Sequence, residues 1–516
     1  MQYRTKVCFV ALALLGAACG SDDRSSSSPD HNPPPVASRP QSTEAADEAA
    51  TEGASGSPET SPIIDERTEP PEVNPVTDPR EDSLSTFAMD VDTGSYTLAR
   101  GSLQAGIVPD PSTVRTEEFV NYLGQDYDQP EDGPFAVTVD ATAAPFLPSD
   151  TRVVRVGIQG REVENEDRKD ANLTFVIDIS GSMDDPGKLD AVRPALLALV
   201  ESLRSTDRVG IVVYSDETRV LLGSTPVSER EAINDAIEHL RPEGATFVEA
   251  GLRLGYEEAQ VVYDSDRINR VVLLSDGVAN VGETGPDGIL SLIDEQAKQG
   301  IDLVTVGFGL GDYNDTLMEQ LADQGDGFYA YVDSEREAIR LFSQDLTGTL
   351  QTIAREAKVQ VEFNPSTVRS YRLVGFENRQ VADDDFRNDA VDGGEIGAGH
   401  TVTALYEVQL LDEVNDDDWV ARATVRWMHP DTLDSSETGT DLFADDIGDE
   451  FSEAPLRLQQ DVYVAAFAES LRGGGWDDLL PLSTIADELR GIGERLDDAS
   501  VTEVADLVDT RRALDR

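Results

Sequence analysis

Hydrophobic residues follow two alternating patterns between about residues 172 and 350. Short, largely apolar runs such as Leu173–Ile177, Arg208–Tyr214 and Val271–Leu274 are typical of strands that are buried on both faces. Between such runs, apolar residues recur every three or four positions, as in Leu189–Leu203, which predicts helices with one buried side. The alternation predicts an α/β domain with a doubly wound parallel sheet over residues 169–350.

The remaining elements of this domain follow from the same two patterns. They predict strands at Thr218–Leu222, Ile301–Gly307 and Gly327–Val332, and helices at Glu231–Leu240, Val248–Ala259, Ile289–Gln299 and Thr316–Ala322. A long helix, Glu335–Ile353, is expected to close the domain.

The segment 83–168 mixes both patterns on a smaller scale. Apolar residues lie at helical spacing in Tyr96–Ala105 and Arg115–Leu123. Phe135–Asp140 and Arg152–Gln159 instead alternate apolar and polar residues, as half-buried strands do. We therefore expect a small α+β domain over residues 83–168.

The pattern becomes β-rich over residues 351–516, where polar turns separate short apolar stretches. Strands are predicted at Val359–Phe363, Tyr371–Val374, Thr401–Leu410 and Trp419–Trp427, and helices at Asp461–Leu471 and Val501–Leu514. This segment is expected to form a β-rich C-terminal domain with a helical tail.

The first 82 residues carry a targeting signal and a linker. Residues 1–19 combine a positively charged start, an apolar stretch too short to span a bilayer, and small residues before Cys19. They resemble a bacterial lipoprotein signal in which Cys19 is lipidated; an ordinary secretory peptide is the alternative. Gly20, in place of Asp, favours the outer membrane. Residues 20–82 are rich in Ser, Pro and Glu and predict a disordered stalk.

Charge limits the class of partner. The chain has 41 Lys and Arg against 101 Asp and Glu, a net charge of −60, which repels nucleic acid and anionic lipid and attracts cations. Two explanations of this negative charge remain open. One is a saline habitat, where a Debye length of ~3 Å at 1 M weakens repulsion between the acidic residues. The other is a solubilising surface on an exported protein. The two cysteines, Cys8 and Cys19, both lie near the N-terminus, so the rest of the chain forms no internal disulfide.

Three separated segments place oxygen donors at the ends of predicted strands. They contain two carboxylates and three hydroxyls: Asp178, Ser180, Ser182, Thr246 and Asp276. Such hard donors suit Mg²⁺ or Mn²⁺ rather than zinc or copper. In a doubly wound sheet, ligands bind outside the carboxyl ends of the strands, which is where Asp178 and Asp276 fall. The alternative is a metal-free domain in which these side chains cap turns.

This pattern resembles the metal-ion-dependent adhesion site of von Willebrand factor type A (VWA) domains. The resemblance implies that Ser180 and Ser182 ligate directly, that Asp178 and Asp276 act directly or through water, and that Thr246 changes its ligation when a partner docks. It also implies Mg²⁺ or Mn²⁺ as cofactor, with Ca²⁺ as an alternative, and a protein partner that offers an Asp or Glu carboxylate.

The flanking segments resemble those of a family of bacterial VWA lipoproteins. Asp90–Tyr96 and Arg115–Tyr122 are similar to the N-terminal domain that precedes VWA in that family, and Tyr371–Arg379 and Gly394–Glu407 are similar to its C-terminal domain of unknown function. The match covers nearly everything after residue 83.

The sequence contains none of the common catalytic motifs that would indicate an enzyme. The chain has no GxSxG, HExxH, CxxC or P-loop sequence, and His400 has no Ser or Cys partner beside it. We expect a non-enzymatic, lipid-anchored protein of the bacterial cell envelope that binds a protein through a metal. The alternative is an envelope scaffold in which the metal only stabilises the fold.

Overall fold

The computed structural model describes residues 73–244, 246–277, 285–309, 315–344, 348, 350–477 and 479–515 of the 516-residue chain. The predicted signal peptide, Cys19 and the stalk up to residue 72 lie outside these residues. The last part of the predicted stalk, 73–82, is ordered: the Asn74 amide donates to the carbonyls of Leu373 (3.1 Å) and Gly375 (2.7 Å). Among the described residues, no helix is both long and apolar enough to cross a membrane.

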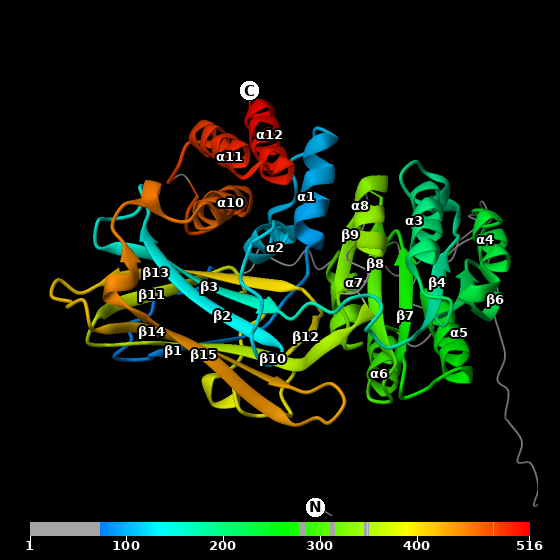
Figure 1. The fold of residues 1–516 in the computed structure, drawn as a ribbon. Coiled ribbons are helices and arrows are strands. Elements are labelled where there is room, and N and C mark those ends of the chain that lie inside the picture. Colours follow the sequence, from blue (N-terminus) through cyan, green and yellow to red (C-terminus); the bar gives the residue numbers. More distant parts are fainter. Residues whose placement is uncertain are drawn as a thin grey trace, which may run out of the picture. The chain divides into compact units, whose positions relative to one another are not determined.

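A six-stranded sheet with the order β6-β5-β4-β7-β8-β9 forms the centre of residues 169–350 (Figure 1). Neighbouring strands are parallel except for β5 and β6, which are antiparallel. The strands are β4 (Ala171–Asp178), β5 (Arg208–Tyr214), β6 (Thr218–Pro226), β7 (Ile268–Ser275), β8 (Asp302–Phe308) and β9 (Tyr329–Val332).

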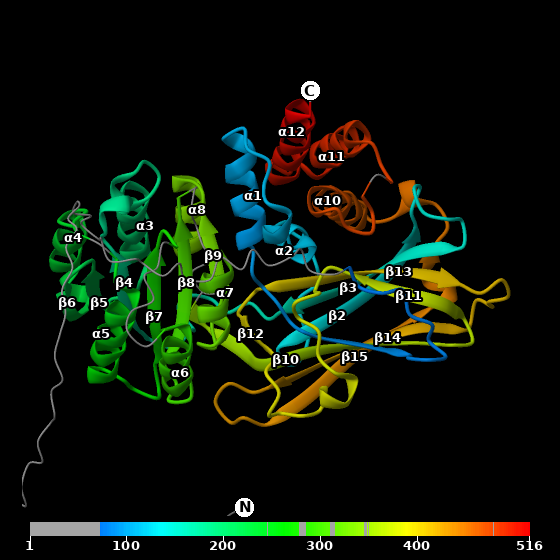
Figure 2. The same ribbon diagram turned by 180° about the vertical axis from the view of Figure 1, so that it is seen from behind.

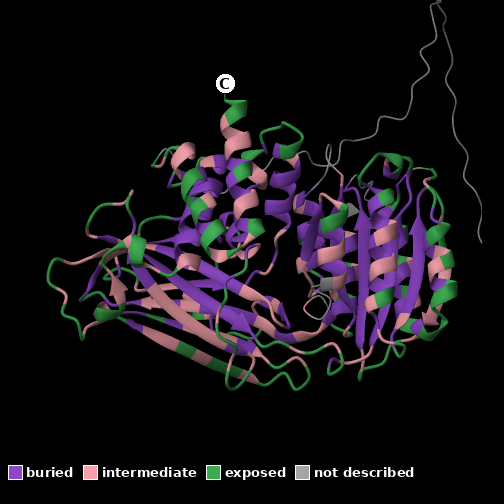
Figure 3. Ribbon diagram, turned by 45° about the horizontal axis from the view of Figure 1, so that its top comes forward, coloured by how far each residue is buried: buried purple, intermediate pink, exposed green. Residues whose placement is uncertain are grey.

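Helices cover both faces of this sheet, because successive strand residues point to opposite sides. In β4, Phe175 and Ile177 belong to one core, whereas Val176 belongs to the other. The first core includes α3 (Leu189–Ser202), α4 (Arg230–Glu238) and α8 (Glu335–Ile339), and the second α5 (Val248–Val261), α6 (Gly285–Ala297) and α7 (Asp315–Asp323). Strands β4, β5, β7, β8 and β9 are accordingly buried along nearly their whole length (Figure 3), whereas β6 at the sheet edge is half-buried or exposed. The predicted doubly wound α/β architecture is confirmed.

The rest of the described chain forms two further sheets that pack face to face. One has the order β11-β13-β3-β2-β16, and the other β1-β10-β14-β15 with β12 paired to β10. The strands are β1 (Leu84–Ala88), β2 (Phe135–Ala143), β3 (Thr151–Gly160), β10 (Thr352–Phe363), β11 (Val368–Val374), β12 (Gly394–Gly397), β13 (Thr401–Leu410), β14 (Trp419–Met428), β15 (Ser435–Phe443) and β16 (Ile447–Gly448). Val156 of β3, Val361 of β10 and Tyr406 of β13 lie in the shared core.

A layer of helices covers the outer face of the β3–β13 sheet (Figure 2). It consists of α1 (Gly94–Gln104), α2 (Thr116–Asn121), α10 (Leu456–Arg472), α11 (Leu482–Leu496) and α12 (Ala499–Leu514). Val153 and Leu405, which point away from the sandwich core, pack against these helices.

The structure corrects the expected division of the flanking segments into separate domains. Strand β3 pairs with β13 over nine residue pairs, from Thr401–Gln159 to Gln409–Thr151, and β1 pairs with β10. Residues 83–168 and 351–516 thus share both sheets and the helical layer. We call this joint unit the flanking module.

Two element predictions are also corrected. The helix expected over Glu335–Ile353 is helical at its described residues as far as Leu350, with a π-helical turn over Arg340–Gln344 after α8, but its predicted end is wrong because Thr352 already begins β10. Pairing of Thr352 with Gly397 of β12 outweighs the helical spacing at the start of β10. Helix α11 has no counterpart in the sequence prediction.

Candidate metal centre

The three predicted segments meet at the carboxyl edge of the six-stranded sheet. Asp178 is the last residue of β4 and pairs in register with Tyr214 of β5, while Ile177 pairs with Leu274 of β7. Asp276 directly follows β7. Parallel neighbours therefore bring Asp178 and Asp276 to adjacent strand ends.

Backbone hydrogen bonds join the Thr246 loop to the Ser180 loop. The Gly181 amide donates to the Gly244 carbonyl (3.0 Å), and the Glu243 amide donates to the Ile179 carbonyl (2.5 Å). Gly244 has a φ of +72°, and a Cβ there would lie 1.5 Å from Oδ1 of Asp216, so only glycine fits. Thr246 is buried just beyond this turn.

Asp178 is fully buried and is held by donors on both carboxylate oxygens. Oδ1 accepts the Ser180 amide (2.8 Å) and Oδ2 accepts the Ser275 hydroxyl (3.2 Å). The hydroxyls of Ser180 and Ser182 lie 3.1 Å apart. Burial raises the pKa of Asp178 to about 6, although the hydrogen bonds from Ser180 act in the opposite direction.

Asp276 is also buried, and it forms an ion pair that the sequence prediction missed. Nζ of Lys188 lies 3.0 Å from Oδ2 of Asp276 and 3.5 Å from Oδ2 of Asp185. Lys188 directly precedes α3, where the sequence gives no sign that it reaches a strand end 88 residues away.

The donor set fits a hard divalent cation. Every predicted ligand is an oxygen, with two carboxylates for charge and three hydroxyls for further coordination. Among the described residues, no group of three or more His, Cys, Asp or Glu is placed to hold a metal, so the hydroxyls are essential to the predicted set. Asp178, Ser180, Ser182, Thr246 and Asp276 are the residues that would hold the ion.

Residues beside these buried donors reach the surface. Gly181, Asp184 and Asp185 are exposed, Ser182 is half-buried, and Phe247, next to Thr246, is 43% exposed. The donor set therefore lies directly beneath exposed residues, two of them acidic and one aromatic.

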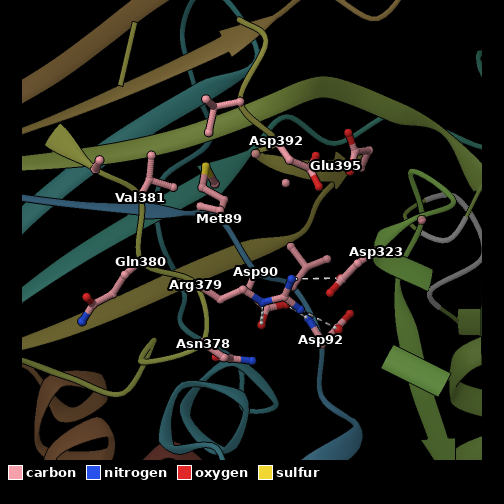
Figure 4. Close-up of a pocket in the computed structure, with 17 residues that line it drawn as sticks. Met89, Asp90, Asp92, Asp323, Asn378, Arg379, Gln380, Val381, Asp392 and Glu395 are labelled. Atoms are coloured by element: carbon pink, nitrogen blue, oxygen red, sulfur yellow. Dashed lines mark hydrogen bonds and ion pairs between the residues drawn. The ribbon is translucent and has the colours of Figure 1, made fainter. Parts of the chain in front are cut away.

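A second cluster of charges lies where the flanking module meets α7, β9 and α8. Arg379 contacts Asp90 (3.1 Å), Asp92 (3.4 Å), Asp323 (2.9 Å) and Glu319 (3.3 Å) beside a cavity of about 340 Å³. Figure 4 shows its guanidinium among the carboxylates of Asp90, Asp92 and Asp323. We call the whole cluster the ion-pair seam; its members are Arg100, Arg115 and Arg379 with Asp90, Asp92, Asp315, Glu319, Asp323, Asp333 and Glu337.

The seam also covers the edge strand β9. The Tyr329 amide donates to Oδ1 of Asp92 (2.9 Å), and the Thr97 hydroxyl donates to the Tyr331 carbonyl (2.8 Å). A Cβ on Gly94 would lie 2.1 Å from the Tyr329 ring, so α1 packs closely against this strand. The flanking module thereby satisfies backbone groups that an edge strand would otherwise expose.

The six-stranded sheet and the three loops at its carboxyl edge define the class as a protein with a VWA domain. A family profile described as von Willebrand factor type A domain matches residues 172–345, one described as von Willebrand factor matches 63–155, and one described as YfbK, C-terminal, matches 348–514. The chain is 35% identical over 425 residues to the YfbK protein of Escherichia coli strain K12, and the alignment covers 78% of this chain and 73% of that protein. The chain therefore belongs to the YfbK family.

Other matches are confined to part of the chain. Protein sll0103 of Synechocystis is 30% identical over 197 residues, covering 38% of this chain and 46% of that protein. Human inter-alpha-trypsin inhibitor heavy chain H3 is 29% identical over 193 residues, covering 35% and 21%. A solved von Willebrand factor type A structure from Catenulispora acidiphila aligns with a TM-score of 0.42 at 15% identity, covering 70% of this chain and 88% of that one.

Proposed function

We propose that this protein binds a protein partner through a divalent cation held at the carboxyl edge of its VWA sheet. The observation that carries the proposal is the meeting of two buried carboxylates and loop hydroxyls from three segments beneath an exposed rim. A cation there supplies an electrophilic position that a carboxylate of the partner can fill.

The chain's own residues perform distinct parts of this binding. Asp178 is fixed by Ser180 and Ser275, so its carboxylate is oriented before an ion arrives. Ser180 and Ser182 add ligands without adding charge, which leaves the cation able to attract an acidic group. Phe247, exposed beside Thr246, offers an apolar contact next to that group.

We further propose that the protein is a non-enzymatic lipoprotein of the bacterial cell envelope, anchored at the outer membrane through Cys19. The signal-like residues 1–19 support this localisation. The inter-alpha-trypsin inhibitor heavy chains to which this chain is similar are not named as enzymes.

The ion-pair seam favours a second candidate, an envelope scaffold in which the metal only stabilises the fold. The buried Arg100 and Arg115 and the half-buried Arg379 tie the VWA domain to the flanking module. The same contacts suit adhesion, because a rigidly held domain transmits force from its partner to the anchor.

Calorimetric titration of Mn²⁺ and Mg²⁺ into the purified full chain tests the metal site. We expect saturable binding at one site, its loss in Asp178→Ala, and its retention in Asp184→Asn, which removes an exposed carboxylate close by. Equal, weak binding by all three proteins would show that the acidic surface merely collects cations.

Partner binding is tested separately with the immobilised chain and envelope extract. Under the adhesion proposal, a protein is retained in Mn²⁺, is released by chelator, and is not retained by Asp178→Ala. Retention that ignores both the chelator and the substitution would contradict metal-dependent adhesion.

A further inference from the structure

Lys188 is a nearly buried lysine that points at a predicted metal ligand. Its side chain is 9% exposed, and its ammonium lies 3.0 Å from Asp276 and 3.5 Å from Asp185. Lysine is rare in this chain, with five in 516 residues, and the other ion pairs of lysine shown here, Lys169–Asp431 and Lys298–Asp294, lie on the surface.

The fold provides a slot for this side chain. Gly309, which follows β8, has a φ of +82°, and a Cβ there would lie 2.3 Å from Cε and 2.8 Å from Cγ of Lys188. The stem of Lys188 therefore lies directly against the backbone of Gly309. The backbone next to Lys188 is also held in place: the amide of Gly187 donates to Oδ1 of Asp190 (2.8 Å), which fixes the turn before α3.

A buried carboxylate requires a compensating charge. Asp276 is 2% exposed, so leaving it ionised without a cation nearby is costly. Lys188 supplies one positive charge at contact distance. A divalent cation held by Asp276 needs the same negative charge and is repelled by the ammonium, since the two positive charges interact over a short distance in a poorly screened site.

We propose that Lys188 is an internal counter-cation that holds Asp276 in the metal-free protein and competes with the divalent ion. This inference rests on the proposed metal site. Lys188 thereby stabilises the metal-free fold and weakens metal binding, so that the site fills only when free metal is abundant. Partner binding then depends on the metal concentration outside the protein.

Calorimetric titration of Mn²⁺ at constant ionic strength tests the competition. In the full chain, Lys188→Met is expected to bind Mn²⁺ on the order of 10- to 100-fold more tightly than the natural protein, within the usual range of coupling between two binding events. Lys298→Met, which removes an equal charge from a lysine that is 73% exposed, is the matched control and should bind as the natural protein does. Equal or weaker binding by Lys188→Met would overturn the inference.

Thermal unfolding in chelator gives a second readout that needs no metal. Lys188→Met should unfold at a lower temperature than the natural protein, and the loss should largely disappear when Asp276→Asn is also present, because the charge to be balanced is then gone. An equal loss in both backgrounds would show that Lys188 contributes packing only, and would overturn its role as counter-cation.

Failure of the inference is distinguishable from failure of the proposed function. If the natural protein binds Mn²⁺ and Asp178→Ala does not, the metal site stands whatever Lys188→Met does. If the natural protein shows no saturable site, the adhesion proposal and the competition fall together.

Discussion

Replacing Arg379 by methionine removes the central cation of the ion-pair seam. Its guanidinium contacts four carboxylates within 3.4 Å, and the side chains of Asp90 and Asp92 are each only 3% exposed. Methionine keeps much of the volume but leaves these acids without their shared partner. Breaking a buried pair in this way costs about 3–5 kcal/mol, a large fraction of the ~5–15 kcal/mol that stabilises a typical domain.

Urea unfolding of the full chain, followed by tryptophan fluorescence, measures that cost. The matched control is Arg387→Met, since Arg387 is 64% exposed in its pair with Glu437 and its loss should cost at most ~1 kcal/mol. Burial and the charge of Asp90 already hold the pKa of Asp92 well above its usual range. Removing Arg379 should raise the pKa of Asp92 further, because the charge of Arg379 lowers it. Acidification should therefore neutralise Asp92 and reduce the difference in unfolding free energy between Arg379→Met and the natural protein. Equal losses for both variants, or a deficit that is unchanged by acid, would refute this reasoning.

Two further predictions concern single residues. Burial and the charge of Glu377 raise the pKa of Glu117 to about 7 from an ordinary 4.5, so the folded state loses stability as pH rises between those values. In urea unfolding, Glu117→Gln should therefore raise the unfolding free energy by up to about 3 kcal/mol at pH 8 and leave it unchanged near pH 4.5. A gain in stability that does not depend on pH would contradict this prediction. Gly244→Ala places a Cβ against Asp216 and should weaken Mn²⁺ binding in calorimetry without removing a predicted ligand. The control is Gly106→Ala, which also has a positive φ (+76°) but has open space around it, and which should leave Mn²⁺ binding unchanged. Equal affinities for Mn²⁺ in the two variants would contradict this role for the Gly244 turn.

Most strands of the VWA domain could be predicted because they are apolar and almost entirely buried; β6, at the edge of the sheet, is the exception and is mostly half-buried or exposed. The strand predicted over Arg208–Tyr214 agrees with β5 at both ends, and the same holds for Thr401–Leu410 and β13. Partners of the flanking strands could not be predicted. The alternation in Arg152–Gln159 predicts which face of the strand is buried. It does not predict that the strand pairs with β13, which lies more than 240 residues further along the chain.

Asp178, Ser180, Ser182 and Asp276 could be placed at one edge of the sheet because they follow recognisable strands, whereas Thr246 lies in the loop between α4 and α5. Asp178 and Asp276 needed only the rule that parallel strands end at one edge of a sheet. Lys188 could not be found in this way, since its role depends on the Gly309 slot, which exists only after β7 and β8 pair. The ion-pair seam could not be predicted from the sequence either, because Arg379 and Asp323 come together only when the flanking module packs against α7.

The ion-pair seam and the predicted metal site involve different parts of the VWA domain, and this allows adhesion to be distinguished from scaffolding. Arg379 acts on α7 and on loops of the flanking module, whereas Asp178 lies at the end of β4, with β7 and β8 between it and β9. A metal that binds only the folded state adds stability in either case, about 2.7 kcal/mol at a hundred times its Kd. Under adhesion, the site serves the partner, so Arg379→Met should leave the affinity for Mn²⁺ unchanged. Under scaffolding, the metal and the seam support one packing arrangement, and the same substitution should weaken Mn²⁺ binding as well.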